Sequence, residues 1–135
     1  MRKLIIAIIA ALTGTLVASA AALAQQAGRP APDFQLPKAG GEVQKLADLK
    51  GRVVYLDFWA SWCGPCRKTF PWMNAMQKKY GPAGLTVVAV NVDEKRKDAD
   101  EFLAKLPAEF TVLFDANGQL AKQYDLKGMP SAYLI

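Results

Sequence analysis

Two cysteines separated by two residues, Cys63 and Cys66, have the types and spacing best suited to chemistry in this sequence. They lie in the segment Trp62-Cys63-Gly64-Pro65-Cys66, and the chain has no other cysteine. This spacing puts Cys63 at a helix N-terminus, where free backbone N–H groups and the helix dipole favour a thiolate. Cys63 is therefore predicted to attack a substrate disulfide, and Cys66, one turn further in, to resolve the mixed disulfide. Gly64 and Pro65 are expected to set the turn between them.

The same spacing also occurs in metal sites and in structural disulfides. A zinc site needs four ligands, and two cysteines without any histidine cannot supply them, so no metal site is predicted. A purely structural disulfide stays open as an alternative, although a bridge across so short a loop constrains the unfolded chain little. The absence of histidine also excludes histidine-based acid/base catalysis. Asp57, six residues before Cys63, is left as the candidate base.

The cysteine pair lies between a predicted strand and a predicted helix. Residues 53–59 are a near-continuous run of β-branched and aromatic residues, typical of a strand buried on both faces. Residues 66–80 have apolar side chains at helical spacing, with an expected kink at Pro71. Further strands are predicted at 85–92, 111–114 and 132–135, and further helices at 98–106, opened by an Asp98–Glu101 capping box, and at 119–124. Strands alternating with helices predict an α/β sheet.

The segment around the cysteines resembles the active-site segment of the thioredoxin superfamily, and in particular its exported TlpA/ResA-like thiol-disulfide oxidoreductases. The resemblance rests on residues 58–68 and on Gly128-Met129-Pro130-Ser131, and it extends over about residues 30–135. It implies a thioredoxin-like α/β fold in which the helix at 98–106 and the strand at 111–114 form an insertion. The family fold continues with a further strand and a final helix, so the domain is expected to be truncated at its C-terminus.

The resemblance also implies roles for residues outside the cysteine pair. Pro130 matches the cis-proline that faces the cysteines in this family. Met129 would then offer its backbone to an extended substrate segment. Trp59 is expected either to flank the site or to pack in the core. The substrate-binding residues implied in this way are Trp62, Gly64, Pro65, Met129 and Pro130.

Asp57 matches the buried acid of thioredoxins. A carboxyl group in an apolar strand has a raised pKa and can exchange a proton, here with Cys66 during resolution. The alternative is a partly exposed aspartate at the strand end. Ala89 stands where thioredoxins commonly have a lysine beside this acid, so Asp57 is expected to be harder to ionise.

The function implied by the resemblance is reduction of protein disulfides, with no bound cofactor and with a membrane-embedded thiol relay as electron donor. A cytochrome c maturation thioredoxin is an alternative, but Thr69 stands where those proteins often have a glutamate. A peroxiredoxin-like thiol peroxidase is a second alternative, against which Gly64 and Pro65 between two cysteines argue. A non-catalytic binding module is a third.

Residues 1–24 have the pattern of an export signal. Arg2 and Lys3 precede an uncharged apolar stretch that ends in Ala22-Leu23-Ala24, a small-x-small pattern that signal peptidase accepts. An uncleaved membrane anchor is the alternative. Residues 25–32 are then a linker, 33–135 the thioredoxin-like domain, and the periplasm the expected location. The net charge is +5, and without Arg2 and Lys3 the remaining 15 basic and 12 acidic residues give +3. A surplus this small is typical of a solubility feature, whereas a nucleic-acid site needs a concentrated basic face, so no nucleic-acid partner is predicted.

Overall fold

The computed structural model describes residues 28–135. The predicted export segment and the first residues of the predicted linker lie outside the described residues. The described part opens with an antiparallel hairpin of β1 (Gln35–Pro37) and β2 (Val43–Lys45), followed by the 3-10 helix η1 (Leu46–Leu49). No helix within residues 28–135 is long and apolar enough to cross a bilayer.

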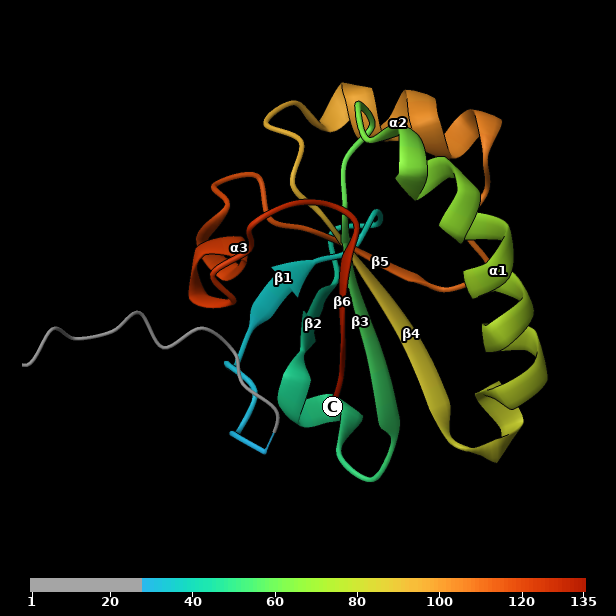
Figure 1. Ribbon diagram of the computed structural model, residues 1–135, viewed down its shortest axis with the longest axis vertical. Coiled ribbons are helices and arrows are strands. Elements are labelled where there is room, and N and C mark those ends of the chain that lie inside the picture. The colour runs from blue at the N-terminus through green and yellow to red at the C-terminus, as the bar shows by residue number, and fades with distance from the viewer. Residues whose placement is uncertain (1–27) are drawn as a thin grey trace, which may run out of the picture.

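The main sheet has four strands in the order β5-β4-β3-β6 (Figure 1). These strands are β3 (Val53–Trp59), β4 (Leu85–Asn91), β5 (Thr111–Phe114) and β6 (Ser131–Leu134). The helices between them are α1 (Gly64–Tyr80), η2 (Gly81–Ala83), α2 (Arg96–Lys105) and α3 (Gln119–Gln123). β3, β4 and β5 are parallel, and β6 pairs antiparallel with β3. The predicted α/β sheet is confirmed, and α2 with β5 forms the predicted helix-strand pair.

Each face of this sheet has its own buried cluster, because side chains alternate along β3. Tyr55 and Trp59 pack into a cluster with residues of α1 and α2. Leu56 and Phe58 pack on the opposite face with residues of η1 and α3. Figure 1 shows α1 and α3 on opposite sides of the strands. Asp57 lies between Tyr55 and Trp59 in this alternation, so its side chain points to the face that α1 covers.

The capping box predicted at Asp98 and Glu101 is wrong. α2 begins earlier, at Arg96, and its N-cap Lys95 makes no side-chain capping hydrogen bond. The earlier start has a physical reason, because the Arg96 guanidinium lies 3.7 Å from the centre of the Phe114 ring and anchors the first turn to β5. Asp98 lies in that first turn, where a carboxylate is favourable to the helix dipole.

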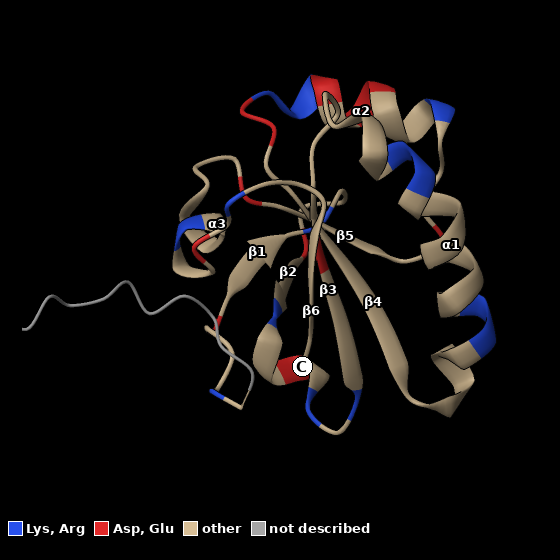
Figure 2. Ribbon diagram, in the orientation of Figure 1, with Lys and Arg blue, Asp and Glu red and all other residues tan. Residues whose placement is uncertain are grey.

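Charge is distributed unevenly over this fold. Figure 2 shows Lys, Arg, Asp and Glu mainly on the helices and connecting segments, with the strands of the main sheet almost uncharged. Asp57 in β3 is the exception, since β4, β5 and β6 contain no charged residue. An isolated acid at the centre of an apolar sheet is costly to ionise, which makes Asp57 a candidate for a functional group.

Candidate active site

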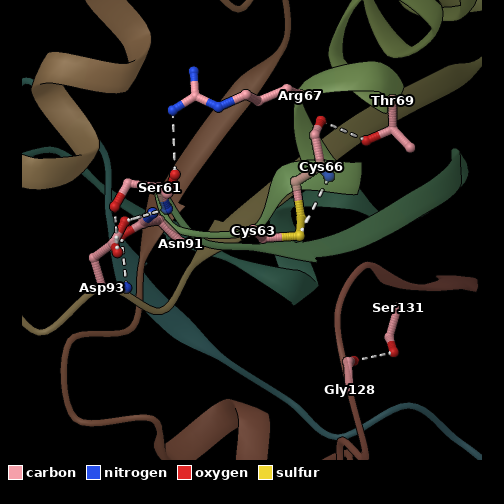
Figure 3. Close-up of a disulfide and its surroundings, with 9 residues drawn as sticks. All are labelled: Ser61, Cys63, Cys66, Arg67, Thr69, Asn91, Asp93, Gly128 and Ser131. Carbon is pink, nitrogen blue, oxygen red and sulfur yellow. Dashed lines mark hydrogen bonds between the residues drawn. A yellow bond between two sulfur atoms is a disulfide. The ribbon is translucent and has the colours of Figure 1, made fainter.

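The two cysteines are joined by a disulfide at the start of α1, just beyond the carboxyl end of β3 (Figure 3). Cys63 is the N-cap of α1, and its Sγ accepts the backbone N–H of Cys66 at 3.3 Å. Their Cα atoms are 5.3 Å apart. Cys63 keeps 4% of its surface exposed and Cys66 none, so Cys63 is the member of the pair that another molecule can reach.

The helix that positions the pair starts two residues earlier than predicted, at Gly64. Pro65 suits this first turn because the first N–H groups of a helix have no partner within it. The hydroxyl of Thr69 donates to the carbonyl of Cys66 at 2.9 Å. α1 then continues past Pro71, and its buried Phe70 packs on the sheet.

Four of the five residues predicted to bind substrate lie at the surface. Trp62 is 70% exposed, and Gly64, Pro65 and Pro130 are exposed as well. Met129 is half-buried and packs against the buried cluster that includes both cysteines. Trp62, Gly64 and Pro65 adjoin the cysteines along the chain, and the loop that contains Met129 and Pro130 lies near the disulfide (Figure 3). Their contact with substrate stays a prediction.

The segment from Gly128 to Ser131 is a compact loop near the disulfide (Figure 3). The Met129–Pro130 peptide bond is cis, as the family resemblance predicts. The Ser131 hydroxyl donates to the Gly128 carbonyl at 2.6 Å and closes the loop. β6 begins at Ser131, so the loop is attached directly to the strand beside β3.

Trp59 is part of the core. It has no exposed surface, and its ring centroid lies 4.9 Å from that of Phe70 and 4.7 Å from that of Phe102. Of the two predictions for Trp59, core packing is confirmed. Because this cluster also contains both cysteines, the aromatic rings form the apolar floor beneath the disulfide.

Asp57 is buried, with 1% of its surface exposed, so the alternative of a partly exposed strand-end aspartate is wrong. Its Oδ2 has no hydrogen-bond partner within the described part of the chain. Burial raises the pKa of Asp57 to about 7. The charge of Asp57 in turn adds to the burial that raises the pKa of Tyr55. A carboxyl group with such a pKa can both hold and release a proton near neutral pH.

A buried carboxylate that sequence reasoning missed lies behind the active-site loop. Asp93, 5% exposed, accepts the backbone N–H and the hydroxyl of Ser61, both at 2.9 Å (Figure 3). It also accepts the side-chain amide of Asn91 at 2.7 Å. The signal available in the sequence is its position, two residues after the end of β4, at the same edge of the sheet as the cysteines.

A polar groove of about 210 Å³ lies between the active-site loop and α2. It is lined by Ser61, Trp62, Arg67, Asp98, Glu101, Phe102 and Lys105. The Arg67 guanidinium lies 4.7 Å from the centre of the Phe102 ring and donates to the Ser61 carbonyl at 3.4 Å. This links the first turn of α1 to α2. No group of three or more metal-ligating side chains occurs within residues 28–135.

The sequence that forms this site matches a known protein family. Residues 27–135 match the model of the AhpC/TSA family. The chain belongs to the AhpC/TSA family. Among curated members, ResA thiol-disulfide oxidoreductase of Bacillus subtilis is 38% identical over 108 residues, which cover 80% of this chain and 60% of ResA. ResA of Oceanobacillus iheyensis is 38% identical over 112 residues, covering 80% and 58%. The chain thus spans about 60% of the length of the curated relatives it matches.

Solved structures of similar proteins share the thioredoxin-like fold. A Chlorobium tepidum protein provisionally described as thiol:disulfide interchange protein DsbE is 63% identical, with a TM-score of 0.75, covering 78% of this chain and 74% of that one. The thioredoxin domain of a Bacteroides vulgatus thiol-disulfide oxidoreductase is 23% identical, with a TM-score of 0.78 and coverage of 83% and 82%. The second similarity shows the fold alone. The thioredoxin-like fold and the resemblance to TlpA/ResA-like proteins are confirmed.

Proposed function

We propose that this chain is a thiol-disulfide oxidoreductase that reduces disulfides of polypeptides through Cys63 and Cys66. One observation supports this function most directly. The Cys63 sulfur caps the N-terminus of α1, and Cys63 is the only one of the two cysteines with exposed surface. Cys66 is fully buried and forms the disulfide with it. A helix N-terminus favours the thiolate, which is the attacking species in disulfide exchange.

The exchange takes place in two steps. The Cys63 thiolate attacks one sulfur of the substrate disulfide, and the other sulfur leaves as a thiolate that takes up a proton. Cys66 then loses its proton and attacks Cys63 Sγ, which releases the second substrate sulfur and forms the Cys63–Cys66 disulfide. Two electrons pass from the dithiol to the substrate. An external dithiol must return them before the next cycle.

Asp57 is the proposed proton acceptor for the second step. Its side chain faces α1 on the same side of the sheet as the cluster that contains both cysteines. With a pKa raised to about 7, its carboxylate form is available at neutral pH and is basic enough to take the Cys66 proton.

The substrate segment is proposed to lie across the exposed border of the disulfide. Trp62 offers an exposed aromatic surface on one side of Cys63. Pro130 lacks a backbone N–H, so the adjacent Met129 offers the backbone groups of the loop to an extended substrate segment. This arrangement suits an unfolded or extended polypeptide better than a small molecule.

Export to the periplasm is part of the proposal and rests on the pattern of residues 1–24. An exported dithiol cannot draw electrons from the cytoplasm directly. We therefore propose a membrane-embedded thiol relay as the donor, whether the N-terminal segment is cleaved or retained as an anchor. No bound cofactor is required for either half of the cycle.

Catalysed reduction of insulin disulfides by dithiothreitol tests the proposed function. The chain should accelerate insulin reduction, and Cys63→Ser should abolish the acceleration because serine cannot form a mixed disulfide. Trp72→Phe, on the exposed side of α1, is the matched control and should react as the native chain does. A native chain without any acceleration would reject the proposal and favour a binding module.

Thiol peroxidase activity is the second candidate, because the chain belongs to a family named for AhpC and TSA. It is tested by following hydrogen peroxide in the same dithiothreitol solution. We expect peroxide consumption at the uncatalysed rate, since Gly64 and Pro65 form a turn between two cysteines that suits disulfide exchange.

A cytochrome c maturation thioredoxin is the other alternative, and Thr69 argues against it. The Thr69 hydroxyl donates to the Cys66 carbonyl and supplies no carboxylate beside the pair, which supports a general reductase.

A further inference from the structure

The active-site turn is held from behind by one carboxylate. Residues 60–63 form a turn closed by the hydrogen bond from the Cys63 N–H to the Ala60 carbonyl, at 3.1 Å. Ser61, inside this turn, donates its backbone N–H to Asp93 Oδ2 and its hydroxyl to Asp93 Oδ1, both at 2.9 Å. Both oxygens of one buried carboxylate are therefore committed to one residue of the turn.

Asp93 is itself fixed by Asn91 at the end of β4. The Asn91 amide donates to Asp93 Oδ2 at 2.7 Å, and the Asp93 N–H donates to Asn91 Oδ1 at 3.1 Å. Both residues are buried, and hydrogen bonds to a buried charge are stronger than those between neutral groups. The turn that presents Cys63 is thus tied to the rigid central strand of the sheet.

We propose that Asp93 is a positioning residue of the disulfide-exchange site, which holds the turn so that Cys63 stays within reach of Cys66 when the disulfide is open. This inference rests on the proposed function and deepens it. When the S–S bond is broken, Cys63 is still restrained by the helix cap, by its N–H hydrogen bond to Ala60 and by the Asp93–Ser61 contact, which holds the turn from behind. A restrained pair closes faster and more favourably than a loose one, because its effective concentration is higher.

If Asp93 has this role, losing its contact with Ser61 should shift the equilibrium between the chain's disulfide and glutathione. The chain's disulfide reacts with two molecules of glutathione to give the Cys63 and Cys66 thiols and one glutathione disulfide, so atoms and electrons balance. Loosening the turn lowers the effective concentration of the two thiols and makes the disulfide easier to reduce. Removing the carboxylate charge acts in the same direction, because a nearby negative charge disfavours the thiolate of the reduced form.

The experiment equilibrates the full chain with glutathione buffers and counts oxidised and reduced forms by mass after alkylation. Asp93→Asn keeps the shape of the side chain but leaves one Ser61 donor without an acceptor. Ser61→Ala removes the hydroxyl bond alone. Each should favour reduction by about three- to tenfold, the factor that one ordinary hydrogen bond is worth. Ser61→Thr keeps the hydroxyl and should stay near the native equilibrium.

Asp115→Asn is the matched control. Asp115 is a buried carboxylate that also accepts two hydrogen bonds, from the N–H groups of Gln119 and Ala121, but it holds the first turn of α3 and not the active-site turn. It should lose stability and leave the glutathione equilibrium within about twofold, the lower limit of one hydrogen bond. A separate unfolding titration of each variant measures the stability change.

Two results would overturn the proposal: an unchanged equilibrium in Ser61→Ala, or an equal shift in Asp115→Asn. If Asp93→Asn does not fold, the Ser61→Ala and Ser61→Thr pair decides. The glutathione equilibrium does not depend on catalysis of protein substrates. A failed insulin assay would therefore reject the proposed function without deciding the role of Asp93, and an unchanged equilibrium would reject that role without touching the function.

Discussion

Asp57 and Ala89 stand directly opposite each other in the parallel register of β3 and β4. The buried carboxyl group therefore has a methyl group where a basic side chain could offset its charge. Burial is the cause of its raised pKa, and no cation lowers that pKa again. Both the stability of the fold and the proposed proton transfer should consequently depend on this one residue.

The first prediction concerns stability against pH. The pKa of Asp57 is about 7 in the folded chain and 3.8 in a model peptide, so between these values folding takes up a proton. The free energy of unfolding of the native chain should then fall as pH rises from about 4 to about 7, and stay level above that. Asp57→Asn lacks this dependence. Its stability relative to the native chain should rise by roughly 3 kcal/mol between pH 5 and pH 8, at about 1.4 kcal/mol per pKa unit.

Urea titrations of the oxidised proteins at pH 5 and pH 8 measure this difference. Asp98→Asn, at an exposed position on α2, is the control and should show no such trend. A stability difference between Asp57→Asn and the native chain that does not change with pH would show that the pKa of Asp57 is not raised in the folded chain.

The second prediction concerns the resolving step. Without a carboxylate at position 57, Cys66 has no internal base, and the loss of a general base typically costs about 10²-fold or more. Stopped-flow reduction of a disulfide substrate should show normal formation of the mixed disulfide by Asp57→Asn and slow release of product. Slow formation of the mixed disulfide with normal release of product would show that Asp57 assists the attack by Cys63 on the substrate and not the resolving step.

The third prediction separates the two tryptophans that precede the cysteine pair in the sequence. Trp59 is fully buried, so Trp59→Ala should cost about 3–5 kcal/mol of unfolding free energy. Trp62 is 70% exposed, so Trp62→Ala should change stability by no more than about 0.5 kcal/mol.

Turnover gives the complementary measurement for Trp62. If its ring contacts the substrate, Trp62→Ala should raise KM for insulin reduction and leave the glutathione equilibrium unchanged. An unchanged KM would remove Trp62 from the proposed substrate surface.

The sequence predicted those parts of the site that are local. The cysteine spacing, the preceding apolar strand and the following helix all lie within residues 53–80, where residue periodicity reports burial directly. The cis bond at Met129–Pro130 was predicted from family resemblance alone. The helix boundary at Gly64 was missed by two residues because glycine and proline favour turns as well as first helical positions.

Non-local contacts could not be read from the sequence. Ser61 and Asp93 are 32 residues apart, and only the parallel pairing of β3 with β4 brings their segments to the same sheet edge. The start of α2 was likewise mispredicted, since Arg96 is held by the ring of Phe114 on β5 and not by a local cap. In both cases the deciding partner lies on another element.

The most direct test of the central claim uses Cys66→Ser. This variant keeps the exposed Cys63 and removes the resolving thiol, so it should accumulate a covalent mixed disulfide with a disulfide-containing polypeptide. Mass spectrometry should find the chain mass increased by that of the substrate, with the bond at Cys63 and full release by dithiothreitol; Cys63→Ser should show no adduct. An adduct formed equally by Cys63→Ser, or none formed by Cys66→Ser, would contradict the assignment of Cys63 as the attacking residue.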